Sequence, residues 1–343
     1  MNSYERTMAA MRGEPHDRVP VMLHNFMMAA REINVSMGRF REDPKLIAQA
    51  FIHAVEKYGY DAILMDVDTV TLAGSLGVPV DLPEDDPARL SSGLLGSLEE
   101  LKKLPPPQVE NYRYVQNWLE AVRLLRQYFG NEVLIRGNCD QAPFSLAALV
   151  RGIDNFMLDL YLAEPQLIVD MLEYCTEATC QFIRLMAQAG AHMVSNGEST
   201  AGPELISPEH YQEFALPYDK IIIREAHKHN LPYVLHICGN TDLILEMMME
   251  SGADAFELDY KTDIYRAFDV LHDKVTFIGN IDPSGVIALG TPDLVRQKTT
   301  ELLDVFCKTN RFILNAGCAI PAITPEANIF ALVETAKKYM LRT

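Results

Sequence analysis

The feature that most restricts the fold of this chain is the regular alternation of short β-rich runs with longer segments of helical periodicity. Eight such runs occur, in residues 19–25, 60–68, 132–138, 191–198, 232–238, 254–259, 274–282 and 311–318. Strands that alternate with helices form parallel sheets, and eight such units close a barrel. We therefore predict an α/β protein with a (β/α)8 TIM barrel.

The segments between the runs support this fold. Ser207-Pro208 and Thr291-Pro292 each place a capping side chain before a proline that suits the first helical turn. Residues 69–131 and 139–190 exceed the length of one helix, so long excursions are expected after the second and third strands, the first of them over the barrel mouth. No low-complexity linker interrupts the chain, and residues 1–343 are predicted to form a single domain with an N-terminal extension. An open doubly wound sheet is the alternative, but no glycine-rich dinucleotide fingerprint follows any run.

Composition and charge exclude several classes of partner. The formal net charge is −17, whereas nucleic acids and anionic membranes bind positively charged surfaces. The chain contains no uncharged run of about 20 residues and no secretion or lipidation signal. Six cysteines are scattered without the spacing of a secreted disulfide scaffold, namely Cys139, Cys175, Cys180, Cys238, Cys307 and Cys318. We expect a cytoplasmic protein with thiols or metal ligands, and no nucleic-acid or membrane partner.

Polar side chains end almost every run, where a (β/α)8 barrel places its active site. Burying so many polar groups at one end of a core costs several kcal/mol each unless they are paired or coordinate something. We therefore predict a site formed by His24, Asn25, Asp66, Asp68, Asn138, Asp140, Asn196, Glu198, His236, Cys238, Glu257, Asp259, Asn280, Asp282 and Cys318. For Asp68, Asp140 and Asp282 taken singly, capping of the following turn is the alternative.

The run YVLHICGN ends with two potential metal ligands. His236 and Cys238 are two residues apart on a strand and point to the same face, and Cys318 ends the eighth run at the same rim. Catalytic zinc takes three protein ligands from His, Cys and carboxylates. From the residues alone, both a zinc site and a buried histidine beside inert thiols remain open.

The sequence also offers further candidate ligands and a nucleophilic role for cysteine. Glu198, at the end of the neighbouring run, is the best additional ligand or nearby carboxylate, and Cys139 is a weaker one. A nucleophilic cysteine with a histidine base is disfavoured, because no third group is placed to orient the imidazole. Cys175 and Cys180 lie on a helical stretch and are expected to be buried small hydrophobes.

Three stretches of the sequence resemble the uroporphyrinogen decarboxylase superfamily: LHICGNTDLILEMMMESGADAFELD, FIGNIDPSGVIALGTPDLV and LNAGCAIPAITPEANIFALVETAKKY. The opening YERTMAAMRGEPHDRVPVM and the piece ELISPEHYQEFALPY are similar as well. The resemblance spans nearly the whole chain and is most specific between residues 195 and 341. Within the superfamily it points to the corrinoid methyltransferase branch, which includes the methylcobamide:coenzyme M methyltransferases of methanogens.

This resemblance implies a function and a metal. The branch's zinc ligands carry over to His236, Cys238 and Cys318. The enzyme implied is a Zn²⁺-dependent methyltransferase that moves a methyl group between a corrinoid and a small thiol, methoxy or methylamine-type compound, in either direction. Free-standing corrinoid carriers typically show an Asp-x-His-x-x-Gly loop, and no histidine here lies two residues after an aspartate. A separate carrier protein is therefore expected to supply the methylated corrinoid over the barrel mouth, and a homodimer is a further expectation.

The same resemblance leaves two alternatives, a decarboxylase and a non-catalytic relative that binds zinc or a corrinoid partner. The decarboxylase's F-M-R-Q-A-G-R segment corresponds here to HNFMMAAREINVSMGRF, which keeps Arg31 but lacks the first arginine. Cys318 stands where the decarboxylase pattern has His, while Asp68 is a counterpart for its central aspartate. The predicted roles are catalytic for Glu198, Asp68 and Asp259, cofactor-binding for Asn138, Asn280 and Asp282, and metal-binding for His236, Cys238, Cys318 and Glu198.

Overall fold

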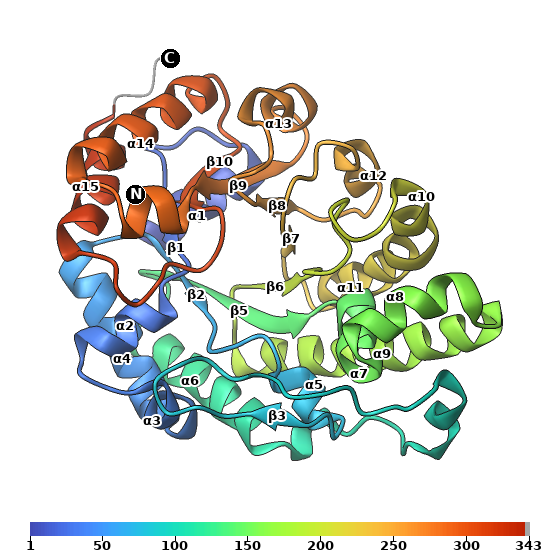
Figure 1. The fold of residues 1–343 in the computed structure, drawn as a ribbon. Coiled ribbons are helices and arrows are strands. Elements are labelled where there is room, and N and C mark those ends of the chain that lie inside the picture. The colour runs from blue at the N-terminus through green and yellow to red at the C-terminus, as the bar shows by residue number, and fades with distance from the viewer. Residues whose placement is uncertain (340–343) are drawn as a thin grey trace.

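The computed structural model describes residues 1–339 and contains one ring of eight parallel strands (Figure 1). In ring order these are β1 (Met22–Leu23), β2 (Ala62–Met65), β5 (Leu134–Gln141), β6 (Met193–Gly197), β7 (Tyr233–Ile237), β8 (Ala255–Leu258), β9 (Thr276–Ile281) and β10 (Phe312–Ala316). A parallel bridge between Val21 and Leu314 joins β10 back to β1. Each predicted run coincides with one strand, although β5 extends past its run to Gln141, so the (β/α)8 barrel is confirmed.

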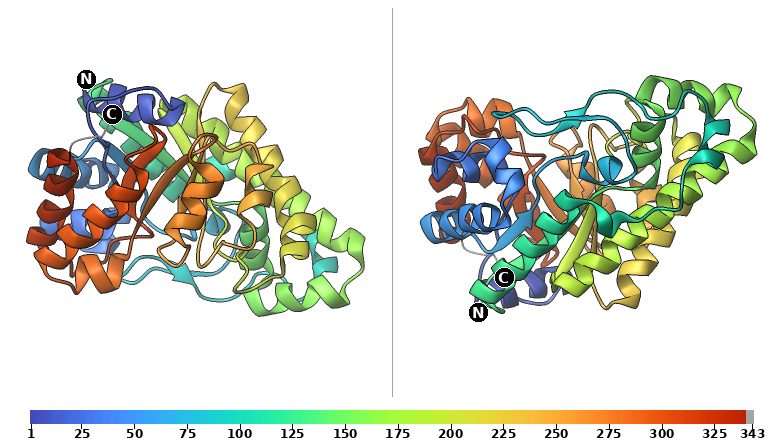
Figure 2. Two further views of the ribbon diagram at one scale, coloured as in Figure 1. Left: turned by 90° about the horizontal axis from the view of Figure 1, so that it is seen from above. Right: turned by 90° about the horizontal axis from the view of Figure 1, so that it is seen from below.

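Helices surround this ring (Figures 1 and 2). The α-helices are α1 (Ser3–Arg12), α2 (Phe26–Glu32), α3 (Met37–Glu42), α4 (Pro44–Tyr58), α5 (Thr71–Ser75), α6 (Arg113–Phe129), α7 (Pro143–Arg151), α8 (Ile153–Leu162), α9 (Pro165–Ala189), α10 (Pro208–His210), α11 (Leu216–Lys228), α12 (Leu245–Met249), α13 (Ile264–Leu271), α14 (Pro292–Phe306) and α15 (Glu326–Lys338). Shorter turns of helix are η1 (Leu98–Lys103), η2 (Val109–Asn111), η3 (Tyr211–Ala215) and η4 (Pro283–Ala288). Ser207 and Thr291 accept backbone hydrogen bonds at the predicted caps of α10 and α14. None of the helices described is long and apolar enough to cross a membrane.

The N-terminal extension closes the bottom of the barrel. Ala10 and Met11 of α1 pack against the first apolar side chains of the strands, including Met22 of β1. The carboxylate of Asp61, which is fully buried, forms ion pairs with Arg6 of α1 and with Arg18. Because this end is filled, the opposite end, where the strands terminate, is the one that can hold a site.

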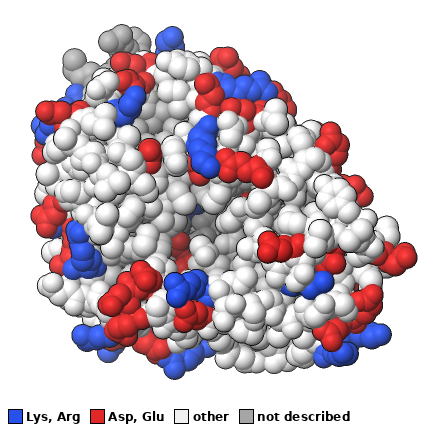
Figure 3. Space-filling view, in the orientation of Figure 1, with Lys and Arg blue, Asp and Glu red and all other residues white. Residues whose placement is uncertain are grey.

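The excursion after β2 borders the open end of the barrel. It contains α5, the antiparallel hairpin of β3 (Val80–Asp81) and β4 (Arg89–Leu90), η1, η2 and α6. Figure 1 shows it running along the lower rim from α3 to α8, and Figure 2 places its stretch around β3 and β4 on the side of the barrel opposite the N-terminus. Backbone bonds from Gly38 to Glu84 and from Leu94 to Val150 fix it there. It was expected to lie over the mouth, but a hollow stays visible at the centre of the same view (Figure 3).

Candidate metal centre and active site

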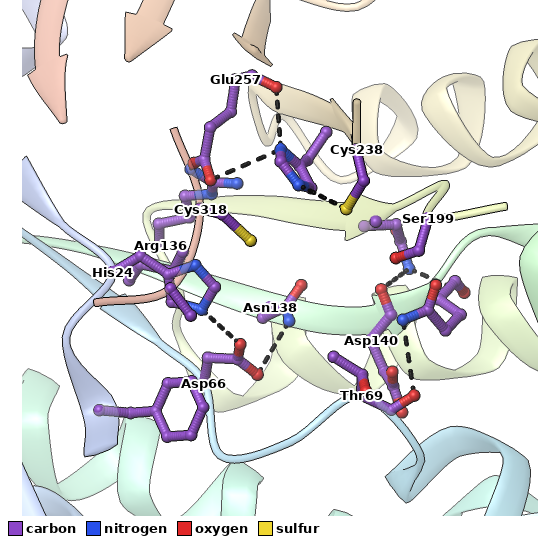
Figure 4. Close-up of a pocket in the computed structure, with 17 residues that line it drawn as sticks. His24, Asp66, Thr69, Arg136, Asn138, Asp140, Ser199, Cys238, Glu257 and Cys318 are labelled. Atoms are coloured by element: carbon purple, nitrogen blue, oxygen red, sulfur yellow. Dashed lines mark hydrogen bonds and ion pairs between the residues drawn. The ribbon is translucent and has the colours of Figure 1, made fainter. Parts of the chain in front are cut away.

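A cavity of about 110 Å³ opens at the carboxyl ends of the strands. We call it the mouth pocket. Its walls come from segments at or just after the ends of most strands, which is where the sequence predicted a site. Figure 4 shows its polar lining, which includes His24, Asp66, Thr69, Arg136, Asn138, Asp140, Gln141, Ser199, His236, Cys238, Glu257 and Cys318.

Three potential metal ligands converge in the wall of the mouth pocket. One imidazole nitrogen of His236 and the sulfurs of Cys238 and Cys318 all lie within 4.8 Å of one another. β7 carries His236 and delivers Cys238 directly after its end, whereas Cys318 follows β10. Gly317 permits this approach, because a Cβ there would lie 2.4 Å from the backbone nitrogen of Tyr260. The structure thus brings together the three residues that the sequence predicted as ligands.

The orientation of His236 suits a metal ligand. Its Nδ1 lies 2.9 Å from the carbonyl oxygen of Glu257 on the neighbouring strand, and its Nε2 lies 3.2 Å from the sulfur of Cys238. A carbonyl oxygen only accepts, so Nδ1 carries the proton and donates it. The Nε2 lone pair of the neutral ring is therefore left to face the two thiols, as in many histidine metal ligands.

Without a metal, the side chains of His236, Cys238 and Cys318 are linked by shared protons. The hydrogen bond with Cys318 lowers the pKa of the Cys238 thiol, and the same bond together with burial raises the pKa of Cys318 to about 12. Burial lowers the pKa of His236, but its hydrogen bond to Cys318 and the charge of Glu257 outweigh that effect and raise it to about 9. A cation is the natural replacement for these shared protons.

Two buried ion pairs flank the three ligands. Arg136 of β5 pairs with Glu257 of β8, and both side chains are 2% exposed. His24 Nε2 lies 2.7 Å from Asp66 Oδ2, while the amide of Asn138 donates to Asp66 Oδ1 at 3.0 Å. Arg136 was not among the residues predicted from the sequence. The signal was a single arginine inside the apolar run EVLIRGN, where a buried charge requires a partner.

Of the residues predicted to bind the cofactor, only Asn138 lines the mouth pocket. Asn280 and Asp282 line a separate pocket of about 260 Å³ beside Lys298 of α14. The carboxylate of Asp282 accepts hydrogen bonds from Ser284 N and Gly285 N at the start of η4. Asp282 therefore caps η4, which was the alternative role considered for it from the sequence.

Asp68 and Asp259 were both predicted to be catalytic. Their carboxylates also accept hydrogen bonds from backbone N–H groups. Asp68 accepts from Val70 N and Thr71 N at the start of α5, so capping describes it as well. Asp259 accepts from Gly239 N and Lys261 N, which fixes the loop that follows Cys238. Neither side chain lines the mouth pocket, and the structure does not bring them to the three ligands.

Comparison with known proteins places this chain in a family. The family model described as uroporphyrinogen decarboxylase (URO-D) matches residues 2–339. The chain belongs to the uroporphyrinogen decarboxylase family. Its sequence is 30% identical to the methylcobamide:CoM methyltransferase MtbA of Methanosarcina acetivorans over 341 residues, which cover 98% of this chain and 97% of that protein.

Other members of the family are similar over comparable lengths. MtbA of Methanosarcina mazei is 30% identical, covering 98% of this chain and 97% of its own. The uroporphyrinogen decarboxylase of Prochlorococcus marinus strain NATL1A is 29% identical, covering 96% and 94%. A solved methyltransferase from Methanosarcina mazei has the same fold, with a TM-score of 0.90 at 22% identity over 98% of this chain and 99% of that one. The resemblance predicted from the sequence is confirmed, and with it the prediction of an enzyme.

The carboxylate of Glu198 is not part of the cluster of three ligands, although its backbone nitrogen donates to the carbonyl oxygen of His236 at 2.7 Å. Its Oε1 accepts from Phe144 N at 3.0 Å, and its Oε2 accepts from the backbone and hydroxyl of Ser145 at 2.9 and 2.7 Å. These are donors of the first turn of α7, whose preceding residue, Ala142, has no capping side chain. Glu198, which follows β6, therefore caps α7 from another part of the chain.

Burial gives this carboxyl an unusual titration. It raises the pKa of Glu198 to about 7, and burial with the charge of Glu198 raises the pKa of Asp219 well above its usual range. The folded state then binds more protons than the unfolded state between pH 5 and 7. The free energy of unfolding must fall as the pH rises through this window, by at most about 1.4 kcal/mol per pH unit for one proton.

We predict that Glu198→Gln, which mimics the protonated acid, removes the share of Glu198 and so makes the slope shallower in urea unfolding measured from pH 5 to 7. Glu120→Gln, on the exposed face of α6, is the matched control and keeps the wild-type slope. An unchanged slope in Glu198→Gln would contradict the assignment. Loss of bound metal in that variant would instead support the ligand role predicted from the sequence.

Proposed function

We propose that this protein is a corrinoid-dependent methyltransferase that binds Zn²⁺ through His236, Cys238 and Cys318. It would move a methyl group between a corrinoid held by a separate protein and a small thiol, methoxy or methylamine-type compound. The observation that carries the proposal is the meeting of one nitrogen and two sulfur ligands within 4.8 Å in the mouth pocket. The methylcobamide:CoM methyltransferases that are 30% identical over nearly the whole chain support the reaction class.

The donor set fits zinc in a catalytic rather than a closed structural site. Imidazole nitrogen and thiolate sulfur are preferred zinc ligands, and three of them leave a fourth position for a substrate. When bound, zinc would supply a Lewis acid that holds the heteroatom of the small molecule and favours the thiolate form of a thiol. Glu257 contributes by fixing the ring of His236 through its carbonyl, and Gly317 contributes by letting Cys318 approach.

The pair of His24 and Asp66 is placed to exchange a proton with the small molecule. Both residues line the mouth pocket, and their side chains are 2.7 Å apart. Burial lowers the pKa of His24, but the hydrogen bond and charge of Asp66 outweigh burial and raise it above its usual value. Asn138 holds the other oxygen of Asp66. We assign to this pair the proton that a thiol loses when it binds as a thiolate, and that the thiolate regains when it leaves after demethylation.

The dimensions and charges of the mouth pocket argue against decarboxylation of a tetrapyrrole. Pockets for ligands of drug size usually have volumes of about 300–1,000 Å³, and this cavity measures about 110 Å³. Among the described residues, Arg136 is the one arginine or lysine in its wall, and Glu257 already neutralises it. A substrate with eight carboxylates would find no free cation there.

The surface around the mouth supports a protein partner. Most of the large apolar side chains that are exposed among the described residues lie on segments that follow strand ends. We call them the apolar rim: Leu158, Tyr161, Leu162, Leu205, Leu243, Tyr260, Tyr265, Leu289 and Ile323. Large apolar side chains that stay exposed together can mark an interaction site, and we propose that the apolar rim is one. A carrier protein seated on the apolar rim would present its corrinoid to the mouth pocket.

The cytoplasmic location, the homodimer and the single domain stay predictions.

We predict that the protein purified with zinc holds one ion per chain and that Cys318→Ala loses it, because two ligands do not retain the ion at micromolar concentration. Metal analysis after dialysis measures this. Cys180→Ala, which removes a buried thiol on α9, is the control and retains the ion. One zinc per chain in folded Cys318→Ala would contradict the ligand assignment.

We predict that the zinc-loaded protein demethylates free methylcobalamin when a suitable small thiol is present. The absorbance change of the cobalt centre measures the rate. His236→Ala should lower that rate at least about tenfold, because even the loss of a residue that only supports a metal ligand costs about 10–100-fold. A non-catalytic relative would bind zinc and produce no spectral change with any acceptor, so this result would overturn the proposed function.

We predict that Leu243→Asp, in the apolar rim, lowers the methyl-transfer rate with a methylated corrinoid carrier protein at least about tenfold, because interface centres tolerate charge poorly. The rate with free methylcobalamin should stay the same. Ile221→Asp, on the outer face of α11, is the control and leaves both rates unchanged. Equal loss with the carrier and with free methylcobalamin would contradict a docking role.

A further inference from the structure

The charges in the mouth pocket are matched or negative. Arg136 is paired with Glu257, and His24 is paired with Asp66. Two thiolates and a neutral imidazole balance the charge of a divalent ion at the proposed metal site. Among the described lining residues, the remaining ionisable group is Asp140. Nothing in this wall offers an unmatched positive charge to a ligand.

Two acceptor atoms in the same wall lack hydrogen-bond partners. Asp140 Oδ1 and Gln141 Oε1 are both buried and unpaired, and both residues line the mouth pocket. The amide nitrogen of Gln141 points to Thr69 O at 3.5 Å, which leaves its oxygen as the free atom. A buried acceptor without a partner costs about 1–3 kcal/mol, so a ligand that donates to these oxygens would recover that cost.

Asp140 is held firmly in this position. Its backbone adopts a left-handed conformation, with φ of 61°, which is uncommon outside glycine and is tolerated best by Asn and Asp. Its Oδ2 accepts from Leu72 N at 2.6 Å, so Oδ1 is the oxygen left over. Burial and the charge of Asp68 raise the pKa of Asp140 well above its usual range. A second anion beside it would disfavour the carboxylate form further, whereas a cation or an N–H or O–H donor would stabilise that form.

We propose that the small-molecule partner of the methyl transfer carries an uncharged or cationic head group with N–H or O–H donors, which Asp140 and Gln141 bind. This inference rests on the function proposed above and specifies its substrate class. It separates this chain from the relatives named for coenzyme M, whose head group is a sulfonate. A sulfonate would bring one negative charge and only acceptors to a wall that already has unpaired acceptors.

Two hydrogen-bond donors in the wall do not favour an anionic head group. Arg136 Nε and His24 Nδ1 also lack partners. The guanidinium is neutralised by Glu257 through a neighbouring nitrogen, and the His24 ring bonds Asp66 through its other nitrogen. Both free N–H groups can bond an acceptor, but the charges of Arg136 and His24 are already matched by Glu257 and Asp66, so they offer no net positive charge to an anion.

Three compounds of the form HS–CH2–CH2–X test the inference: 2-mercaptoethanol, 2-aminoethanethiol and 2-mercaptoethanesulfonate. They share the thiol and the spacer, so only the head group differs. Their S-methyl ethers form a second series that removes differences in thiol acidity. Calorimetry with the zinc-loaded protein measures the Kd of each. The hydroxyl and ammonium compounds are expected to bind at least about tenfold more tightly than the sulfonate, a difference of about 1.4 kcal/mol.

Asp140→Asn tests the role of the carboxylate. Asn tolerates the left-handed backbone and keeps an acceptor for Leu72 N, so the fold should survive. This variant should reduce the preference for ammonium over sulfonate at least about tenfold. The matched control Asp43→Asn, at the N-cap of α4, should keep the wild-type preference.

The inference is overturned if the sulfonate binds as tightly as the other two compounds, if none of the three binds, or if Asp140→Asn leaves the preference unchanged. Turnover with methylcobalamin separates it from the proposed function. Binding in the expected order without methyl transfer would contradict the function and support the head-group assignment. Preferred transfer to the sulfonate would support the function and contradict the assignment.

Discussion

The parallel pairing of eight strands into one ring determines where every functional side chain of this protein can lie. Because all strands run in the same direction, their carboxyl ends meet at one edge, and the bridge from Val21 to Leu314 closes that edge into a mouth. α1 and the ion pairs of Asp61 fill the other end. Side chains distant in sequence, such as His236 and Cys318, therefore meet without any local signal linking them.

Glu257 connects the stability of this mouth to its chemistry. Its carboxylate neutralises Arg136 inside the barrel, while its carbonyl oxygen accepts the proton of His236 Nδ1. Burial alone would raise the pKa of Glu257, but the charge of Arg136 keeps it below its usual value. A buried ion pair of this kind adds little net stability compared with apolar packing, and its loss leaves an uncompensated charge. Its value here is that it fixes the tautomer and direction of the ring that faces the two thiols.

Much of this arrangement could be predicted from the sequence, because the relevant signals are local. Periodicity located all eight strands, and strand ends located His236, Cys238 and Cys318. The role of Glu198 could not be predicted, since it depends on how the end of β6 meets the first turn of α7. The same is true of Asp259, because one of its partners, Gly239 N, lies on the loop after β7. In both cases a polar strand end serves the backbone of a neighbouring element rather than a ligand.

X-ray absorption at the zinc edge of the purified protein reports which atoms surround the metal, and so it tests the proposed His-Cys-Cys site without a model reaction. We predict two sulfur neighbours at about 2.3 Å and one nitrogen neighbour at about 2.0–2.1 Å, with a third sulfur added when 2-mercaptoethanol binds. A zinc environment of oxygen and nitrogen without sulfur, or a spectrum that the thiol does not alter, would contradict this prediction.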